Sequence, residues 1–176
     1  MIVDRKNKYK GFLSIDELTV KTKKGTLVKR EIMVRKNAVA ALVYDTSKKK
    51  YVLTSQWRPI GSEIIEIVAG TLDKPGEDPR DAMKREIMEE IGYETDYINL
   101  IDECYVSPGG TTEIITIYYA EVSNQVEAGG GHASEHEEID IIYMDYDELV
   151  STRFKDAKTI IAVNWLKFNK TQDGLK

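Results

Sequence analysis

Residues 85–92 read R-E-I-M-E-E-I-G, so three glutamates fall within five positions. In a helix, Glu86 and Glu90 lie one turn apart on the same side, and Glu89 flanks them. Three carboxylates in one narrow sector repel one another unless cations stand among them. Because Mg²⁺ and Mn²⁺ prefer hard oxygen ligands, the stretch predicts a divalent metal site. A solvated helix face is the simpler alternative.

The residues before this stretch supply the start and the buried side of the helix. Asp78 followed by Pro79 is typical of an N-cap and a first helical residue. Gly92 is expected to end the helix. The apolar residues that recur at helical spacing and predict the buried stripe are Met83, Ile87 and Ile91.

Short runs of β-forming residues lie on both sides of the helix, which indicates an α/β or α+β fold. Before it they cover 12–35, with a hairpin turn at Lys24-Gly25, and then 38–44, 51–54 and 63–68. After it they cover about 98–106, 113–122 and 139–144, and helices are predicted at 145–152 and 156–168. We expect a small antiparallel β unit (1–36) ahead of the main domain (37–176).

The composition fits one globular domain with a small appendage, because 176 residues can bury a real core. No apolar run reaches the roughly 18 residues of a membrane span. The polar start resembles no signal peptide, and the single cysteine cannot form an internal disulfide. A cytoplasmic protein with no membrane contact is therefore expected.

The net charge of −5 conceals an uneven distribution along the chain. Residues 1–50 hold 14 Lys and Arg against 5 Asp and Glu, whereas residues 51–176 hold 11 against 25. A basic first third could bind nucleic acid. It could equally meet a polyanionic small molecule beside acidic groups that hold cations, or serve only solubility and subunit packing.

Taken from residue 70 onward, the sequence resembles the Nudix hydrolases, whose signature is G-x5-E-x7-R-E-U-x-E-E-x-G-U, with U apolar or aromatic. The matching positions are Gly70, Glu77, Arg85, Glu86, Ile87, Glu89, Glu90, Gly92 and Tyr93. One departure is a six-residue gap after Gly70, with Lys74 or Pro75 as the insertion. The resemblance implies an α/β/α sandwich with a mixed sheet, and Mg²⁺-dependent hydrolysis of a diphosphate linkage, with Mn²⁺ as a substitute ion.

The resemblance also implies roles for single residues. In the family, the glutamates matching Glu86 and Glu90 bind metal, and the one matching Glu89 does so directly or through water. The backbone carbonyl matching Ala69 often completes the coordination. The residues expected to brace the box are Gly70, Glu77, Arg85 and Gly92.

Further motifs resemble the branch that contains the ADP-ribose and GDP-mannose pyrophosphatases. They occupy 30–44, 55–59, 107–113 and 135–141. Members of this branch form homodimers in which the N-terminal β unit crosses to the partner and completes the substrate site. The residues that this resemblance assigns to substrate binding are Arg30, Arg58 and Glu113, each with a plain surface charge or turn residue as the alternative.

Residues 127–138, E-A-G-G-G-H-A-S-E-H-E-E, form a glycine-rich acidic loop. A solvated linker is one interpretation, but long loops inside a compact domain are more often functional. The resemblance makes Glu135 the general base and Glu137 a further metal ligand. Glu138 is the alternative base if the alignment slips, and Glu89 is a third catalytic candidate. His132 and His136 are interpreted as polar loop residues.

The function implied is hydrolysis of nucleoside diphosphate sugars, first of all ADP-ribose to AMP and ribose 5-phosphate. GDP-mannose, giving GMP and mannose 1-phosphate, is a close alternative. Less favoured alternatives are another Nudix substrate, such as a dNTP or capped RNA, and a non-catalytic ligand-binding module. Nucleic acid is an unlikely partner, and the expected partner is a nucleotide sugar.

Overall fold

The computed structural model describes residues 1–131 and 138–173, and for residues 170–173 only the backbone. The chain forms two compact units. One comprises Met1–Asn37 and Cys104–Ile115, and the other comprises Ala38–Glu103 and Thr116–Lys176. The segment 104–115 thus lies with the N-terminal strands, although the sequence suggested a simple boundary after residue 36.

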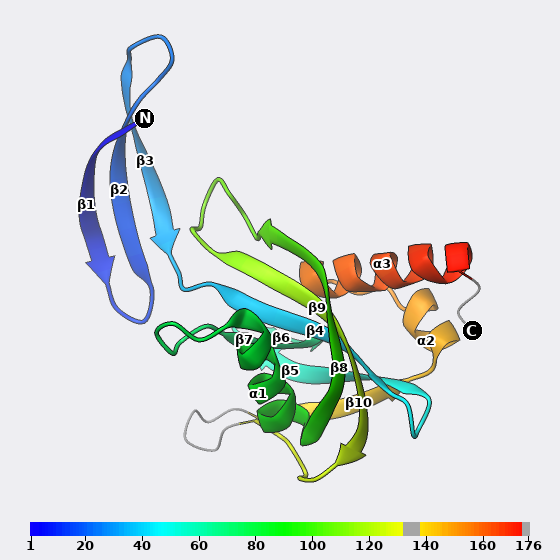
Figure 1. The fold of residues 1–176 in the computed structure, drawn as a ribbon. Coiled ribbons are helices and arrows are strands. Elements are labelled where there is room, and N and C mark those ends of the chain that lie inside the picture. The colour runs from blue at the N-terminus through cyan, green and yellow to red at the C-terminus, as the bar shows by residue number, and fades with distance from the viewer. Residues whose placement is uncertain (132–137, 174–176) are drawn as a thin grey trace. The chain divides into compact units, whose positions relative to one another are not determined.

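The smaller unit is a three-stranded antiparallel sheet in the order β1-β2-β3 (Figure 1). Its strands are β1 (Ile2–Lys10), β2 (Ser14–Lys21) and β3 (Leu27–Val34). The predicted β2–β3 hairpin is confirmed, and Gly25 adopts a φ of 86° in its turn, where a glycine avoids strain. Strand β1 was not predicted, because all nine of its residues are exposed and carry no alternating pattern.

Segment 104–115 joins this sheet through the end of β3. Met33 donates its N–H to the carbonyl of Gly110 at 2.8 Å, and Thr112 donates to the carbonyl of Met33 at 3.0 Å. The Thr112 hydroxyl also accepts from the Arg35 amide at 3.0 Å. The S-P-G-G stretch therefore forms a turn that is bonded to the N-terminal strands.

The larger unit is built on a seven-stranded sheet in the order β10-β5-β4-β9-β8, with β6 paired to β5 and β7 to β4. Its strands are β4 (Ala38–Asp45), β5 (Lys50–Arg58), β6 (Ser62–Glu66), β7 (Val68–Thr71), β8 (Tyr93–Tyr105), β9 (Ile114–Gln125) and β10 (Asp140–Met144). Strands β8 and β9 have residues in both units. The predicted fold class, a mixed α and β architecture after an N-terminal antiparallel sheet, is confirmed.

The central strand β4 has consecutive buried residues. Since alternate residues of a strand point to opposite sides, both faces of β4 are buried. Val39, Ala41 and Val43 share one hydrophobic core with residues of helix α1 (Pro79–Ile91). The opposite face of β4 carries the buried Ala40 and Leu42. Helix α3 (Ala157–Asp173) also contacts β4, so the sheet lies between helices, as Figure 1 shows.

Helix α1 has the limits that the sequence predicted. The Asp78 side chain accepts from the Arg80 amide at 2.8 Å, Pro79 opens the helix, and Gly92 ends it with a φ of 74°. The predicted apolar stripe is fully buried in the core: Met83, Ile87 and Ile91. Strand β8 begins at Tyr93, directly after this cap and five residues earlier than predicted.

The two C-terminal helices were both predicted. Helix α2 (Tyr146–Ser151) begins with a capping box between Asp145 and Glu148. Helix α3 extends five residues beyond the predicted 156–168. In the described part of the chain, no helix is long and apolar enough to span a membrane.

Candidate active site on helix α1

One guanidinium binds the acidic face of helix α1 to the loop before it. Arg85 forms a two-pronged pair with Glu77, with both N–O distances at 3.2 Å. Its Nη1 donates to Glu86 and to Glu89 at 2.8 Å each, and Asp73 lies 3.6 Å from Nη2. The carboxylates of Glu77, Glu86 and Glu89 raise the pKa of Arg85, and that of Glu77 does so most. Lys74 also lies 3.9 Å from Glu77. Two cations among these four carboxylates leave them incompletely neutralised.

The carboxylate of Glu86 lies against the backbone at Gly70, at the end of β7. A Cβ on Gly70 would meet the Glu86 carboxyl carbon at 1.9 Å, so only glycine allows this approach. Burial raises the pKa of Glu86, and the charges of Glu89 and Asp73 add to that rise although Arg85 opposes it. A buried, partly repelled carboxylate of this kind is stabilised by a cation.

Glu90 approaches the same backbone from the next turn of the helix. It is 8 % exposed, and its carboxylate accepts from the Ala69 amide at 3.4 Å. Glu86 and Glu90 therefore flank the Ala69-Gly70 peptide, whose carbonyl at Ala69 was predicted to bind metal. Carboxylate and carbonyl oxygens are the donors that Mg²⁺ and Mn²⁺ prefer, so the donor set fits a hard divalent cation.

Within residues 1–131 and 138–173, no three acidic, histidine or cysteine side chains converge closely enough to form a ready-made metal site. Arg85 engages two of the predicted ligands, Glu86 and Glu89. Glu137, a further predicted side-chain ligand, lies outside the described residues.

The first residues of the acidic loop are hydrogen-bonded to the C-terminal end of α1. Val126 and Glu127 donate their N–H groups to the carbonyl of Gly92, and Gly130 donates to the carbonyl of Glu90 at 2.8 Å. Gly129, with a φ of 69°, packs so closely that a Cβ would meet the Glu90 carbonyl oxygen at 2.6 Å. Gly129 thus allows close backbone packing against the helix that carries the glutamates.

Of the loop residues with predicted roles, only Glu138 is described, and it is exposed. The predicted base Glu135 and the neighbouring His132 and His136 lie outside the described residues, as Glu137 does. Glu89 accepts from Arg85 and is 27 % exposed at its side chain.

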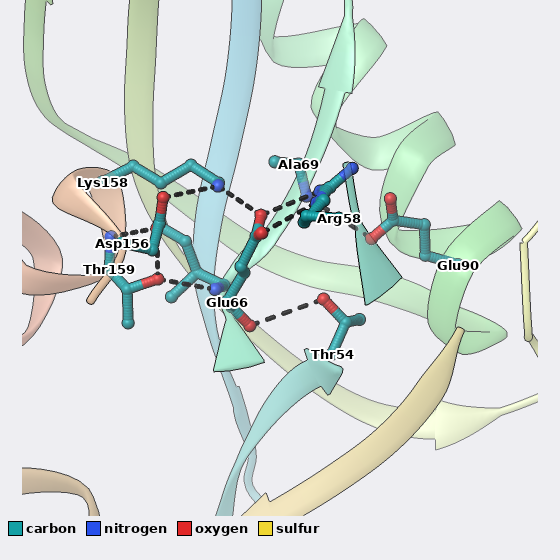
Figure 2. A network of polar contacts seen from close by, with 9 residues as sticks. Thr54, Arg58, Glu66, Ala69, Glu90, Asp156, Lys158 and Thr159 are labelled. Carbon is teal, nitrogen blue, oxygen red and sulfur yellow. Dashed lines mark hydrogen bonds and ion pairs between the residues drawn. The ribbon is translucent and has the colours of Figure 1, made fainter. Parts of the chain in front are cut away.

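A second charged cluster, centred on Glu66 at the end of β6, was missed by the sequence analysis (Figure 2). Arg58 binds both oxygens of Glu66 at 2.9 Å, and Lys158 of α3 binds one of them at 2.5 Å. Burial raises the pKa of Glu66, but the bonds from Arg58 and the charge of Lys158 outweigh it, so that pKa is lowered. A charged residue within the apolar run E-I-I-E-I-V was the available signal.

The other two residues assigned to substrate belong to the smaller unit. Arg30 is exposed on β3, where its Nη1 donates to the carbonyl of Lys29 at 2.8 Å. Glu113 is mostly buried and lies 3.5 Å from the Nε of Arg35. Arg58, in contrast, belongs to the larger unit together with the glutamates of α1.

Comparison with known proteins identifies the family. The NUDIX domain model matches residues 34–163. GDP-mannose pyrophosphatases of Escherichia coli O9:H4 (strain HS) and of Shigella flexneri are each 33 % identical to this chain over 156 residues. Each alignment covers 82 % of this chain and 81 % of the relative.

The fold agrees with that assignment. A crystal structure of an ADP compounds hydrolase superposes with a TM-score of 0.81, at 16 % sequence identity, and the match covers 99 % of this chain and 95 % of the other. At this identity the likeness concerns the fold alone. From the family match, the relatives and the arrangement of Glu86 and Glu90 at Gly70, we conclude that the chain belongs to the Nudix family and is a Nudix hydrolase.

Proposed function

We propose that the protein hydrolyses the diphosphate linkage of nucleoside diphosphate sugars, releasing a nucleoside monophosphate and a sugar phosphate. The observation that carries the proposal is the placement of Glu86 and Glu90 on either side of the Ala69-Gly70 backbone. That arrangement offers several oxygen donors around one peptide, next to which a divalent ion and a diphosphate can both be held.

Each residue then has a distinct task. Glu86, Glu90 and the Ala69 carbonyl would hold Mg²⁺ or Mn²⁺, together with Glu89 and Glu137. When bound, the metal neutralises phosphate charge and lowers the pKa of water. Arg85 and Glu77 keep the helix and the preceding loop together. Glu135 takes the proton from the attacking water, with Glu138 and Glu89 as alternative bases.

The first choice of substrate is GDP-mannose, because the relatives named GDP-mannose pyrophosphatase match this chain over most of its length. ADP-ribose, which the sequence motifs put first, is the second. Arg58, Arg30 and Glu113 are the proposed substrate contacts. A homodimer in which the N-terminal β unit contributes to the partner's site, and a cytoplasmic location, belong to the same proposal.

A substrate panel tests the proposal. Product formation would be coupled to a phosphatase and measured with Mg²⁺ for GDP-mannose, ADP-ribose, ADP-glucose, a dNTP and a capped RNA. Preference for GDP-mannose or ADP-ribose is the expected result. Activity confined to the dNTP or to capped RNA would keep the Nudix reaction but reject the sugar substrates, and silence on every compound with metal bound would point to a binding module.

A further inference from the structure

The Glu66 cluster, defined as Arg58, Glu66, Asp156, Lys158 and Thr159, contains a carboxylate that binds two cations at once (Figure 2). The Glu66 side chain is 7 % exposed, and its two oxygens receive the Nε and Nη2 of Arg58. Lys158, 14 % exposed, shares one of these oxygens. Two-pronged arginine pairs fix the plane of the guanidinium, so Glu66 sets how Arg58 is presented.

Lys158 is itself held from the start of helix α3. Its ammonium group lies 3.0 Å from the Asp156 carboxylate, which also accepts from the Thr159 amide at 2.9 Å and from the Thr159 hydroxyl at 2.7 Å. That hydroxyl in turn accepts from the Ile67 amide at 2.9 Å. The lysine therefore stands at a fixed place beside the chain segment that continues from Glu66 to Ala69 and Gly70.

The two cations differ in what they are able to do next. Arg58 is 40 % exposed at its side chain, and a guanidinium suits phosphate oxygens well. If Arg58 gave up one of its hydrogen bonds to Glu66 in order to bind a diphosphate, the buried charge of Glu66 would be less well neutralised. An uncompensated buried charge is costly, and Lys158 is the neighbour that continues to neutralise Glu66 in that state.

We propose that Lys158 is a positioning residue for substrate binding: it keeps Glu66 neutralised in place, so that Arg58 is available to the diphosphate of the substrate. This inference rests on the proposed function and adds a residue to it. Lys158 does not touch the substrate. It acts through Glu66 on Arg58, and it makes substrate affinity depend on the docking of α3.

The test is the kinetics of Lys158→Met, which keeps an unbranched side chain close in length to the aliphatic part of lysine and removes the charge. Glu66 then depends on Arg58 alone, so KM for GDP-mannose or ADP-ribose should rise about 10-fold while kcat changes less than about twofold. Lys155→Met is the matched control, because Lys155 is exposed on the approach to the same helix and should leave both constants unchanged.

A double variant separates this role from mere support of the fold. In Lys158→Met with Glu66→Gln, the carboxylate that retains Arg58 is gone, so KM should return toward that of Glu66→Gln alone. A structural role predicts instead that the two losses add. Equilibrium dialysis in EDTA, where no turnover occurs, measures the dissociation constant of the nucleotide sugar for the same variants. The dissociation constants should change in the same way as the KM values.

The outcomes distinguish this inference from the function on which it rests. Wild-type protein that neither hydrolyses nor binds a nucleotide sugar rejects the proposed function, and the role of Lys158 with it. If the wild type is active but KM is unchanged in Lys158→Met, only the proposed role of Lys158 is rejected. The same holds if the double variant does not restore KM.

Discussion

Helices α1 and α3 both direct charged side chains at the short segment between Glu66 and Gly70, but with opposite charge balances. From α1, Glu86 and Glu90 reach Gly70 and Ala69. Arg85 and Lys74 are the two cations that pair with four carboxylates of this region. From the start of α3, Lys158 and Asp156 join Arg58 and Glu66, so that two cations face two carboxylates.

This difference in balance separates a site that requires a metal ion from a cluster whose charges already neutralise one another. Carboxylates in excess of their cations raise each other's pKa and gain from an added metal ion. A balanced, hydrogen-bonded cluster gains nothing from a further ion, and breaking it leaves buried charge uncompensated. Charge removal on the α1 side should therefore weaken metal binding and turnover, whereas charge removal in the Glu66 cluster should lower stability and substrate affinity.

The largest effect is expected for Glu90→Gln. It should lower kcat by more than about 100-fold, because it removes the charge of a proposed metal ligand. In EDTA its Tm should equal or exceed that of the wild type, since one carboxylate fewer relieves repulsion. Steady-state kinetics at saturating Mg²⁺ measure kcat, and thermal melts measure Tm. Asp81→Asn on the same helix is the control. A near-wild-type kcat would refute the metal assignment.

Glu66→Gln should show the reverse pattern in stability. The loss of a buried carboxylate leaves Lys158 and Arg58 without their shared partner, which should cost about 2–4 kcal/mol of unfolding free energy. Urea unfolding in EDTA measures this loss of unfolding free energy. The matched control is Glu63→Gln, an exposed position on the same strand. If both variants unfold at the same urea concentration, the Glu66 cluster does not support the fold.

Gly70→Ala tests whether Glu86 must lie against the backbone of β7. The added Cβ would overlap the Glu86 carboxylate and push it from the backbone, so we expect the Mg²⁺ concentration for half-maximal activity to rise about 10-fold. Gly109→Ala is the control, because a Cβ there meets nothing within 4 Å. An unchanged Mg²⁺ requirement would show that Glu86 need not lie against Gly70.

The smallest effect is a pH dependence of the Glu66 contribution. Its pKa is lowered from 4.5 in the folded protein, so the stabilisation is present above about pH 5 and declines as pH falls below 4.5. The difference in unfolding free energy between the wild type and Glu66→Gln should shrink from pH 6 toward pH 3. A constant or growing difference would contradict the lowered pKa.

The limits of α1 and the placement of its glutamates were predicted from the sequence, because both depend on residues close together in the chain. Asp78-Pro79, the apolar stripe and Gly92 define the helix, and helical spacing alone places Glu86 and Glu90 on one side. The motif also marked Gly70 as a bracing residue, but the close approach of Glu86 to it came only from the structure. Most strands of the larger unit were predicted for the same reason, because they contain short apolar runs between turn residues. Strand β7 was not predicted as a separate strand, since it follows β6 after a single residue.

The Glu66 cluster could not be predicted in this way. Lys158 lies 92 positions from Glu66, and no periodicity distinguishes it from the other lysines of the chain. The place of segment 104–115 beside the N-terminal strands was missed for a related reason, because its bonds run from Gly110 and Thr112 to Met33. Contacts between distant segments depend on tertiary packing, which single-sequence patterns do not contain.

The most direct test of the central claim is a Mn²⁺ titration followed by electron paramagnetic resonance, in the wild type, Glu86→Gln, Glu90→Gln and the control Asp81→Asn. We expect the wild type and the control to bind Mn²⁺ equally, and each glutamine variant to bind it at least about tenfold more weakly. Equal binding by all four proteins would show that the acidic face of α1 is a solvated surface and not a metal site.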